Sequence, residues 1–574
     1  MRRLSRPAAL VLAQCLGVAL LCTAHHGMGA LGNKGAYTPF SVGTSVSAQV
    51  FDETHLYAPG ARRFADGYGL PAETDVYELR DRQHGYPVMH SLVLGGLARV
   101  LGGLERAWIF WQGLGPVLLW LSFFAVLRVF TSLLYASSGA WLVLLCAFGP
   151  RHAWLQGADV FYQPLEITRL AHPALSAVFL CVAVFGAIQV CRRAAWLPAF
   201  AWGIAAGLLF SAYYFYWVGF FSAALLAGIA ALLLRKWRLA GRWVVFGAGS
   251  LLSAAPYLYR VLQGGLNPGE NFLMARVGDF THAVVPHSLF MTAVLVGIFL
   301  FWIYRHRRSL HAPVWDKHTA VLFWIYALLA GAGLGMSFHF LSGYDAQHTH
   351  FLNRLAQPLL ALLALIAFWR CWPERLQGKI GRLVLCLAAF LGAAALVRQT
   401  AVAIQTHADH RSDSDEQALG KWLEANAQGS VVATTDSQLA LLLPALASHW
   451  LFVPVADRSL ASTPEALLRY VTVSKLEGRT EEEMWERLTK RGPDDSRLWL
   501  HTSYVLAQQP HLSPQNQAEA HRLWKETDPE EALKTRRLDY VIVEASQTAE
   551  SLTKHFPKAK EVYSNAHWRA IAVH

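Results

Sequence analysis

The chain has 574 residues, of which 54% are hydrophobic, only 16% are charged and 21 are Trp. This composition excludes an ordinary soluble protein. The formal net charge is +11, but the basic residues form short bursts between apolar stretches and no continuous basic face. A nucleic-acid partner is therefore not indicated, and the bursts are typical of membrane topology.

The apolar stretches recur along the first two thirds of the chain, each close to the ~20 residues that cross ~30 Å of hydrocarbon. We predict a multi-pass α-helical membrane protein with about eleven transmembrane helices. The predicted spans are 7–24, 107–127, 132–149, 173–191, 195–211, 213–234, 243–263, 289–304, 319–336, 355–370 and 383–399. The first stretch also has the form of a signal peptide ending at Cys22-Thr23-Ala24, but its length favours an uncleaved span.

Every second connection between the spans is basic, which orients the chain. The bursts are Arg2-Arg3-Arg6, Arg128, Arg192-Arg193, 235–238, 305–308 with Lys317, and 370–382. The alternation predicts a cytoplasmic N-terminus and an extracytoplasmic C-terminal part. All seven cysteines fall inside or beside apolar segments, so neither a disulfide framework nor a CxxC metal site is predicted.

The first outer connection, 25–106, carries two adjacent carboxylates, Asp52 and Glu53, in the segment Phe51-Asp-Glu-Thr-His-Leu-Tyr57. We expect this segment on a polar loop. Further along the same connection lie Arg62 and Arg63. The stretch 89–101 is too short to span a membrane and has apolar residues at helical spacing, which predicts an interfacial helix.

Three further outer connections are predicted, 150–172, 264–288 and 337–355. The second connection offers Asp159, Glu166, Arg169 and His172, and the fourth offers Asp345, His348, His350 and Arg354. The aromatic cluster Tyr213-Tyr-Phe-Tyr-Trp217 is interpreted as an interfacial belt, with sugar stacking or lipid contact as the alternative.

The composition changes near residue 409, which divides the chain into a membrane domain, 1–408, and a soluble C-terminal domain, 409–574. Helices are predicted at 413–427, 438–445, 480–491 and 515–526, and strands at 431–434, 450–453, 539–543 and 566–573. This order indicates an α/β domain with a partly parallel sheet. No glycine-rich phosphate loop follows a strand, so nucleotide binding is not predicted.

The topology and the acidic pair with a Tyr four residues after its second member resemble the GT-C superfamily of membrane glycosyltransferases. The resemblance implies an enzyme of a bacterial inner (plasma) membrane. Such an enzyme moves a sugar from a polyprenyl-phosphate donor to a glycan, lipid or protein acceptor on the outer face. A bacterial mannosyl-, arabinosyl- or aminoarabinosyl-type transferase is implied, because the Trp-Trp-Asp motif of oligosaccharyltransferase catalytic subunits is absent from the tail.

By this resemblance, Asp52 or Glu53 is the catalytic base of an inverting hexosyl or pentosyl transfer. Cations near the donor phosphate would stabilise its negative charge as it leaves. The candidates are Arg62, Arg63, Arg169 and Arg354. The other substrate-binding candidates are Tyr57, Asp159, Glu166, His172, His348 and His350. No cofactor is certain; a divalent cation (Mg or Mn) is a weaker expectation, with Asp52, Asp159 and Glu166 as candidate ligands.

Each candidate also has a structural alternative. Asp52 and Glu53 are suited to capping a helix that starts near Glu53, in which case Asp159 or Glu166 is left as the base. His348 and His350 suit a metal only on an extended segment, and Arg354 has the length to snorkel to lipid headgroups. A different class of function is a non-catalytic polysaccharide-assembly protein or a flippase-like membrane protein.

Overall fold

A computed structural model describes residues 5–40, 48–69, 73–82, 88–148, 165–193, 195–265, 279–312, 315–345, 350–455, 459–489, 514–547 and 550–573. The chain forms two compact units. The helical unit comprises Met1–Met28, Trp108–Leu258 and Phe280–Gln405, and the α/β unit comprises Gly29–Ala107, Tyr259–Asp279 and Thr406–His574. Each unit is described by itself.

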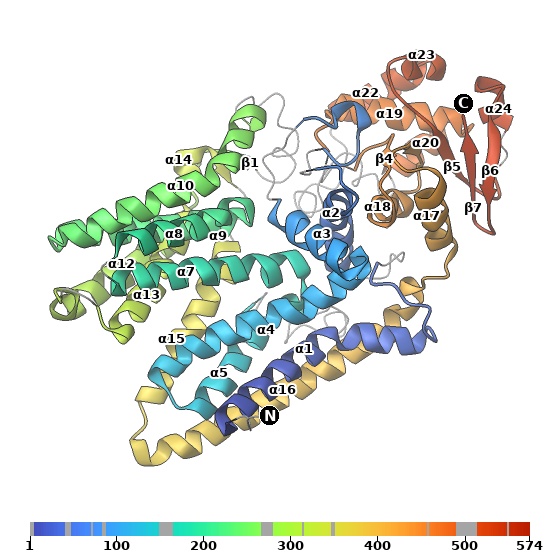
Figure 1. Ribbon diagram of the computed structural model, residues 1–574. Helices are drawn as coiled ribbons and strands as arrows, with labels where there is room; N and C mark the ends of the chain where they lie inside the picture. The colour runs from blue at the N-terminus through green and yellow to red at the C-terminus, as the bar shows by residue number, and fades with distance from the viewer. Residues whose placement is uncertain are drawn as a thin grey trace. The chain divides into compact units, whose positions relative to one another are not determined.

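The helical unit is built from long apolar helices (Figure 1). They are α1 (Arg6–Gly32), α4 (Leu104–Phe130), α5 (Leu133–Cys146), α7 (Ser176–Arg192), α8 (Trp196–Gly207), α9 (Tyr214–Leu233), α10 (Trp237–Gly265), α12 (Pro286–Leu310), α13 (Lys317–Met336), α15 (Gln357–Arg370) and α16 (Glu374–Thr406). Short turns precede or join them: η3 (Glu166–Thr168), η4 (Leu170–Leu175), η5 (Leu208–Ser211), α14 (His339–Ser342) and η6 (Phe351–Ala356), with a two-stranded sheet of β1 (Asp279–Phe280) and β2 (Tyr344–Asp345). The turn η7 (His407–His410) belongs to the α/β unit.

All eleven predicted spans coincide with helices in the described part of the chain. Eight of these helices are long and apolar enough to cross a membrane, which establishes a multi-pass membrane protein. The other three are α5, the continuous α8–η5 segment and α10. The first two are shorter apolar helices, while α10 is long but not among the eight. The predicted count of eleven is therefore not confirmed.

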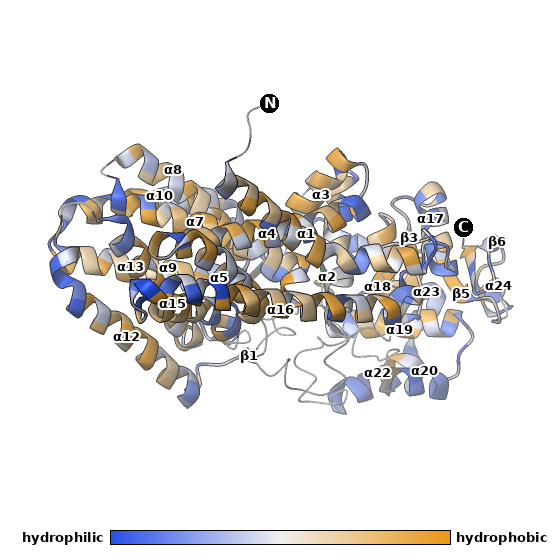
Figure 2. Cartoon of the chain, turned by 90° about the horizontal axis from the view of Figure 1, so that it is seen from below, coloured by the Kyte–Doolittle hydropathy of each residue, from blue (hydrophilic) through white to orange (hydrophobic). Residues whose placement is uncertain are grey.

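Tight helix packing in this unit depends on glycine. A Cβ atom on Gly203 of α8 would lie 2.1 Å from the carbonyl oxygen of Phe246 on α10. A Cβ atom on Gly331 of α13 would lie 2.1 Å from the carbonyl oxygen of Gly219 on α9. Small residues at helix contacts are typical of membrane bundles, where close backbone approach supplies the attraction. In Figure 2, α12 is hydrophobic along its middle and hydrophilic at both ends, as expected for a span.

The α/β unit holds a five-stranded sheet of order β4-β3-β5-β7-β6. The strands are β3 (Val431–Ala433), β4 (Trp450–Leu451), β5 (Tyr540–Glu544), β6 (Lys560–Ser564) and β7 (Trp568–Ala572). Strand β3 is parallel to β4 and β5, whereas β7 is antiparallel to β5 and β6. Thus the predicted partly parallel sheet is confirmed, but β6 was not among the predicted strands.

Helices cover both faces of this sheet, because successive residues of its strands point alternately into two separate hydrophobic cores. Val431 and Val541 face a core with residues of α19 (Thr463–Leu476) and α22 (Pro514–Glu526). Val432 and Ile542 face the opposite core with α17 (Asp415–Asn426) and α18 (Ser437–Leu446). The remaining helices are α20 (Glu481–Thr489), α23 (Pro529–Leu533) and α24 (Glu550–His555).

Local capping explains where these helices begin. The Ser414 hydroxyl accepts from the Gln417 N–H ahead of α17, and the Asp436 carboxylate accepts from the Leu439 N–H ahead of α18. Side-chain oxygens at such positions satisfy backbone donors that have no helical partner. The sequence predicted helices at both places.

The α/β unit also contains part of the first polar connection. Helix α2 (Ala48–Ala65) packs against α3 (Met89–Leu101) and α18. The helix predicted at 89–101 is therefore confirmed as α3. The segment with Asp52 and Glu53, expected on a loop, lies on α2 instead. Because α2 begins at Ala48, the pair is within the helix and does not cap its start.

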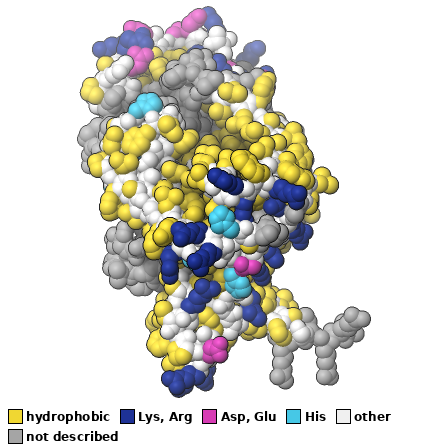
Figure 3. Space-filling model, turned by 90° about the vertical axis from the view of Figure 1, so that its left-hand side faces the viewer, with side chains coloured by type: hydrophobic (Ala, Val, Ile, Leu, Met, Phe, Trp, Pro, Cys, Tyr) yellow, Lys and Arg dark blue, Asp and Glu magenta, His cyan; other side chains and the backbone are white. Residues whose placement is uncertain are grey.

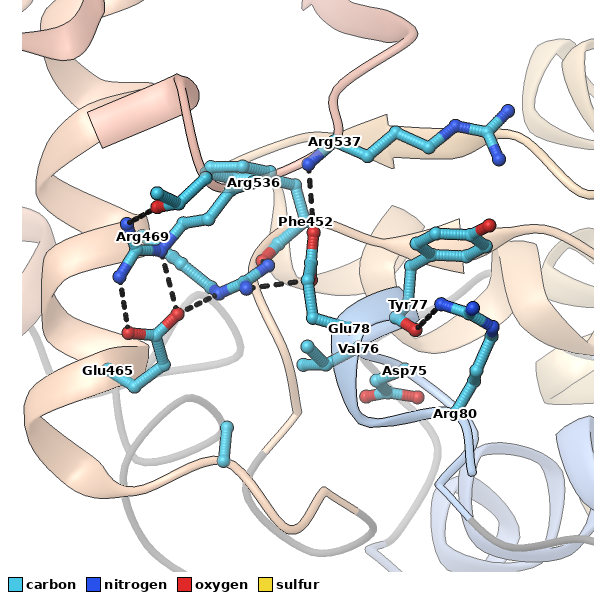
Figure 4. A network of polar contacts seen from close by, with 12 residues as sticks. Asp75, Val76, Tyr77, Glu78, Arg80, Phe452, Glu465, Arg469, Arg536 and Arg537 are labelled. Atoms are coloured by element: carbon cyan, nitrogen blue, oxygen red, sulfur yellow. Dashed lines mark hydrogen bonds and ion pairs between the residues drawn. The ribbon is translucent and has the colours of Figure 1, made fainter. Parts of the chain in front are cut away.

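Residues 73–79, which include the short turn η1 (Tyr77–Leu79), cover the edge of β4. The Leu451 N–H donates to the carbonyl oxygen of Asp75 at 2.8 Å. Next to it, Arg469 donates to Glu78 at 2.8 Å and to Glu465 at 2.7 Å, and Arg536 also binds Glu465 at 2.7 Å (Figure 4). An uncovered strand edge exposes unpaired backbone groups, and here the first connection supplies the cover.

The stability of this contact is predicted to depend on pH, because the buried carboxyl group of Glu73 takes part in it. Its buried carboxylate accepts from the N–H groups of Asp75, Val76 and Leu460. Burial, together with the Asp75 charge, raises the pKa of Glu73 to about 7. The folded state therefore binds more protons than the unfolded state between about pH 4.3 and the folded pKa. We expect the α/β unit to lose up to about 3 kcal/mol of stability as the pH rises through this window.

The measurement is the thermal unfolding midpoint of the full chain from pH 5 to pH 8. Glu73→Gln has no charge to titrate, so its midpoint should vary less with pH than that of the wild type. Glu482→Gln is the matched control, because Glu482 is exposed. An unchanged pH slope in Glu73→Gln would contradict this assignment.

Candidate functional site

Four residues singled out from the sequence meet in the helical unit. Arg169 precedes the wide helical turn η4, and His172 lies within it. His350 precedes the similar turn η6, and Arg354 lies within that one. Wide helical turns of this kind are often found at functional sites. The two turns come from distant parts of the sequence, and Tyr213, just ahead of α9, connects them.

Tyr213 is the centre of this cluster. An Arg354 guanidinium N–H donates to the Tyr213 hydroxyl at 2.6 Å, and the same hydroxyl lies 3.0 Å from Nδ1 of His350. The His172 ring stacks on the Tyr213 ring with centroids 3.7 Å apart, and His172 Nδ1 lies 2.9 Å from the Ser176 hydroxyl. We call these residues, together with Arg169, the Tyr213 cluster.

The direction of the hydrogen bonds follows from the charges. Arg354 can only donate, so the Tyr213 oxygen accepts from it. The Tyr213 hydroxyl donates to His350 in the neutral tautomer that has its lone pair on Nδ1. Burial, reinforced by the Arg354 and Arg169 charges, holds the pKa of His350 well below its usual range. His350 therefore stays neutral at physiological pH and can accept this bond.

The cluster concentrates positive charge in a buried place. Arg169, His172, Tyr213 and Arg354 are each at most 6% exposed. Two guanidinium groups near one another, with planar forks of N–H donors, match the oxygens of phosphate or carboxylate. The structure thus brings two of the candidate phosphate-binding residues, Arg169 and Arg354, into one site.

Arg354 also lines a large apolar cavity inside the helical unit. The cavity has a volume of about 570 Å³ and lies between α4, α7, α13 and α15. Its walls include Leu118, Phe123, Val178, Leu328, Leu355 and Leu359. Tyr216 lines it as well, and its hydroxyl donates to the Arg354 carbonyl oxygen at 3.4 Å. A cationic group therefore faces a space that is otherwise suited to a hydrocarbon chain.

The candidates of the first connection belong to the α/β unit. Tyr57 is buried, with its ring edge-on to His90 at 4.5 Å. Arg62 forms ion pairs with Asp66 at 3.0 Å and with Glu424. Asp52 and Glu53 lie on α2, and their side chains are outside the described part of the structure.

The remaining candidates are Asp159, Glu166 and His348. Asp159 and His348 fall outside the described residues, as does the side chain of Glu166, whose backbone forms part of η3 next to Arg169. Among the described residues, no three His, Cys, Asp or Glu side chains come together as a metal site. The three candidate metal ligands, Asp52, Asp159 and Glu166, have no described side chain.

Two sequence interpretations need correction. Tyr213, Phe215 and Tyr216 do not belong to an interfacial aromatic belt. Their side chains are at most 6% exposed and are packed inside the helical unit. Nor does Arg354 snorkel to the surface, because its side chain is buried against Tyr213. Tyr213 begins the predicted span 213–234, at the same predicted membrane side as His172 and His350, and this position is the signal that could have placed it near them.

Comparison with known proteins gives structural similarity only. No protein-family model matches the chain, and no curated protein matches it. Among solved structures, ArnT from Cupriavidus metallidurans bound to undecaprenyl phosphate matches with 13% identity and a TM-score of 0.43, over 99% of this chain and 98% of that one. The same protein in its apo state matches with 12% identity and a TM-score of 0.43, over 97% and 98%.

An oligosaccharyltransferase from Archaeoglobus fulgidus, in complex with Zn and sulfate, matches with 10% identity and a TM-score of 0.40. That match covers 98% of this chain and 73% of the other. The functional proposal below rests on the residues of this chain.

Removing the central hydroxyl tests the Tyr213 cluster. Tyr213→Phe keeps the ring stack on His172 but removes the link between Arg354 and His350. The bond from Arg354 is charge-assisted and contributes roughly 1.5–3 kcal/mol, so we expect Tyr213→Phe to lower the stability of the folded protein by about that much. Thermal unfolding in detergent, compared with that of the wild type, checks this. Tyr214→Phe, at the neighbouring half-buried position, is the control and should unfold as the wild type does.

Proposed function

We propose that the chain is a GT-C-type membrane glycosyltransferase that moves a sugar from a polyprenyl-phosphate donor to an acceptor. One observation carries the proposal. The Tyr213 cluster contains two buried arginines, and one of them, Arg354, lines an apolar cavity between membrane helices. A ligand that satisfies both parts has an anionic head and a long hydrocarbon chain, which is the chemistry of a polyprenyl phosphate.

In this proposal Arg169 and Arg354 bind the donor phosphate. The first isoprene units of the donor lie in the cavity next to Leu355 and Leu359. Tyr213 and neutral His350 hold the Arg354 guanidinium in place, so that it can stabilise the phosphate without reorganising during the reaction. The cluster would act on the charge that develops on the phosphate as it leaves.

The proposed reaction is a single inverting displacement. The acceptor hydroxyl gives its proton to Asp52 or Glu53, and its oxygen attacks the anomeric carbon. The bond between that carbon and the phosphate oxygen breaks, and the polyprenyl phosphate leaves with the electron pair. Because a phosphate leaves readily as an anion, a second carboxylate acting as an acid is not required.

Several finer features belong to the same proposal. The enzyme would lie in a bacterial inner membrane with its N-terminus in the cytoplasm and residues 409–574 outside, as the basic connections predict. Its sugar would be a hexose or pentose, and its acceptor a glycan, lipid or protein. If a divalent cation takes part, Asp52, Asp159 and Glu166 are the residues we propose to hold it, and it would offset phosphate charge.

The test is sugar transfer in proteoliposomes. Purified protein is supplied with a panel of radiolabelled polyprenyl-phosphate sugars and with a membrane extract as the source of acceptor. We expect labelled product together with one released polyprenyl phosphate per sugar transferred. Movement of intact donor across the bilayer without cleavage would support the flippase-like alternative and overturn the proposal.

A further inference from the structure

The cavity has a second polar end, opposite the Tyr213 cluster. Its lining follows α7 from Ala177 to Arg192, which corresponds to ~22 Å at 1.5 Å per residue. Arg354 lies at one end of this path. At the other end the lining includes Gln189 and Arg192 of α7 and Lys317 at the start of α13.

Gln189 is unusual for a residue inside a membrane unit. It is 7% exposed, and within the described part of the chain its side-chain oxygen has no hydrogen-bond partner. A buried polar group without a partner is destabilising, because it has lost its bonds to water. Because Gln189 lines the cavity, a ligand in the cavity is the natural source of the missing bond.

Arg192 and Lys317 add positive charge at the same end. Their side chains form no ion pair or hydrogen bond with any residue that the structure describes. The nearest acid in sequence, Asp316, caps α13 by accepting from the N–H groups of His318 at 2.8 Å and Thr319 at 3.0 Å. The two cations are thus available to an anion at the cavity mouth.

The surrounding surface is also basic. Figure 3 views the helical unit from the side where the basic connections lie, and Lys and Arg side chains gather there. These connections contain Arg193, Arg235, Lys236, Arg238, Arg307 and Arg308. Such a surface attracts anionic lipids to this side of the membrane.

We propose that this end of the cavity binds an anionic phospholipid. Its phosphate lies between Arg192 and Lys317, the Gln189 side-chain oxygen accepts from a hydroxyl of its glycerol head group, and an acyl chain enters the apolar part of the cavity. Phosphatidylglycerol has this chemistry: a single net negative charge, hydroxyl donors and hydrocarbon chains. The head-group site uses residues outside the Tyr213 cluster, and lipid binding to it can be measured without donor or acceptor.

The experiment measures lipids that the purified full-length protein retains. Protein in detergent is incubated with equal amounts of phosphatidylglycerol and phosphatidylcholine, the excess is removed, and the bound lipids are counted by native mass spectrometry. The wild type should retain phosphatidylglycerol about tenfold more than phosphatidylcholine. Arg192→Gln combined with Lys317→Gln should lose this preference.

Controls separate the parts of the site. Arg193→Gln changes the next, exposed residue, which does not line the cavity, and should keep the preference. The charge-preserving pair Arg192→Lys and Lys317→Arg should keep most of it. Ala125→Phe places a ring in the cavity wall and should lower retention of both lipids. Glycerol 3-phosphate should displace nothing, because it has no chain to place in the cavity.

The double glutamine variant must first show a wild-type elution profile and melting midpoint. If it then still prefers phosphatidylglycerol to phosphatidylcholine, the proposed site is wrong. The inference also fails if glycerol 3-phosphate displaces the lipid, because the site would then recognise a head group alone. If the double variant does not fold, two other variants still test the site. The charge-preserving pair should keep most of the preference, and Ala125→Phe should lower retention of both lipids. Loss of sugar transfer has no bearing on any of these measurements.

Discussion

Replacing the proposed catalytic base, Asp52 or Glu53, should reduce sugar transfer by about 10²- to 10⁴-fold, the usual contribution of a general base. We expect this loss in Asp52→Asn or in Glu53→Gln, but not equally in both, since one carboxylate suffices for an inverting displacement. Each amide keeps the size of the side chain but cannot take the acceptor proton. Donor binding should be unchanged, because the donor phosphate is proposed to contact arginines. Turnover and donor affinity are measured together in proteoliposomes.

Asp81→Asn is the matched control for the base, because Asp81 lies on the same connection with its side chain 92% exposed. It should transfer sugar as the wild type does. If Asp52→Asn and Glu53→Gln both keep full turnover while folding normally, neither carboxylate is the base. Asp159→Asn and Glu166→Gln are then the variants in which the loss should appear.

Arg354→Gln should lower kcat/KM by about 10²- to 10³-fold, the effect of removing one group that stabilises charge in a transition state. Arg354 faces the cavity and is fixed by Tyr213, so both donor binding and departure of the phosphate depend on it. Arg354→Lys keeps the charge but not the planar fork of donors, and should recover only part of the activity. Steady-state kinetics with a fixed donor series measure both effects.

Arg354 is buried, so folding must be separated from catalysis. The thermal midpoint and elution profile of each variant are compared with those of the wild type. Arg370→Gln, at the exposed far end of α15, is the control and should leave kcat/KM unchanged. A folded Arg354→Gln variant with wild-type kinetics would contradict the role assigned to the Tyr213 cluster.

Much of the fold could be predicted because apolar length and helical periodicity are local signals. Helices occur at all eleven predicted spans, and both ends of α13 fall within a few residues of the prediction. Two kinds of feature were missed. The segment around Asp52 forms a helix that packs on α3 and α18, a tertiary contact that its polar sequence did not indicate. Strand β6 has exposed residues on both faces and so lacks the pattern of a half-buried strand.

The site was predicted in part for the same reason. Arg169, His172, His350 and Arg354 were chosen because polar residues at span ends are unusual, and the structure brings them together. Tyr213 was assigned to a belt, since nothing in the sequence distinguishes a tyrosine that faces lipid from one that faces a neighbouring helix. The contacts of Glu73 with Leu460 and of Glu78 with Arg469 could not be predicted either, because the partners are 387 and 391 residues apart in the sequence.

The central claim is that the Tyr213 cluster and the cavity form one site for a lipid phosphate. The most direct measurement is binding of a polyprenyl phosphate and of the matching uncharged polyprenol to the wild type and to Arg354→Gln. It needs neither an acceptor nor a particular sugar. We predict that the wild type binds the phosphate at least about tenfold more tightly than the alcohol, and that Arg354→Gln removes this difference. Equal affinity of the wild type for the two lipids would contradict the account.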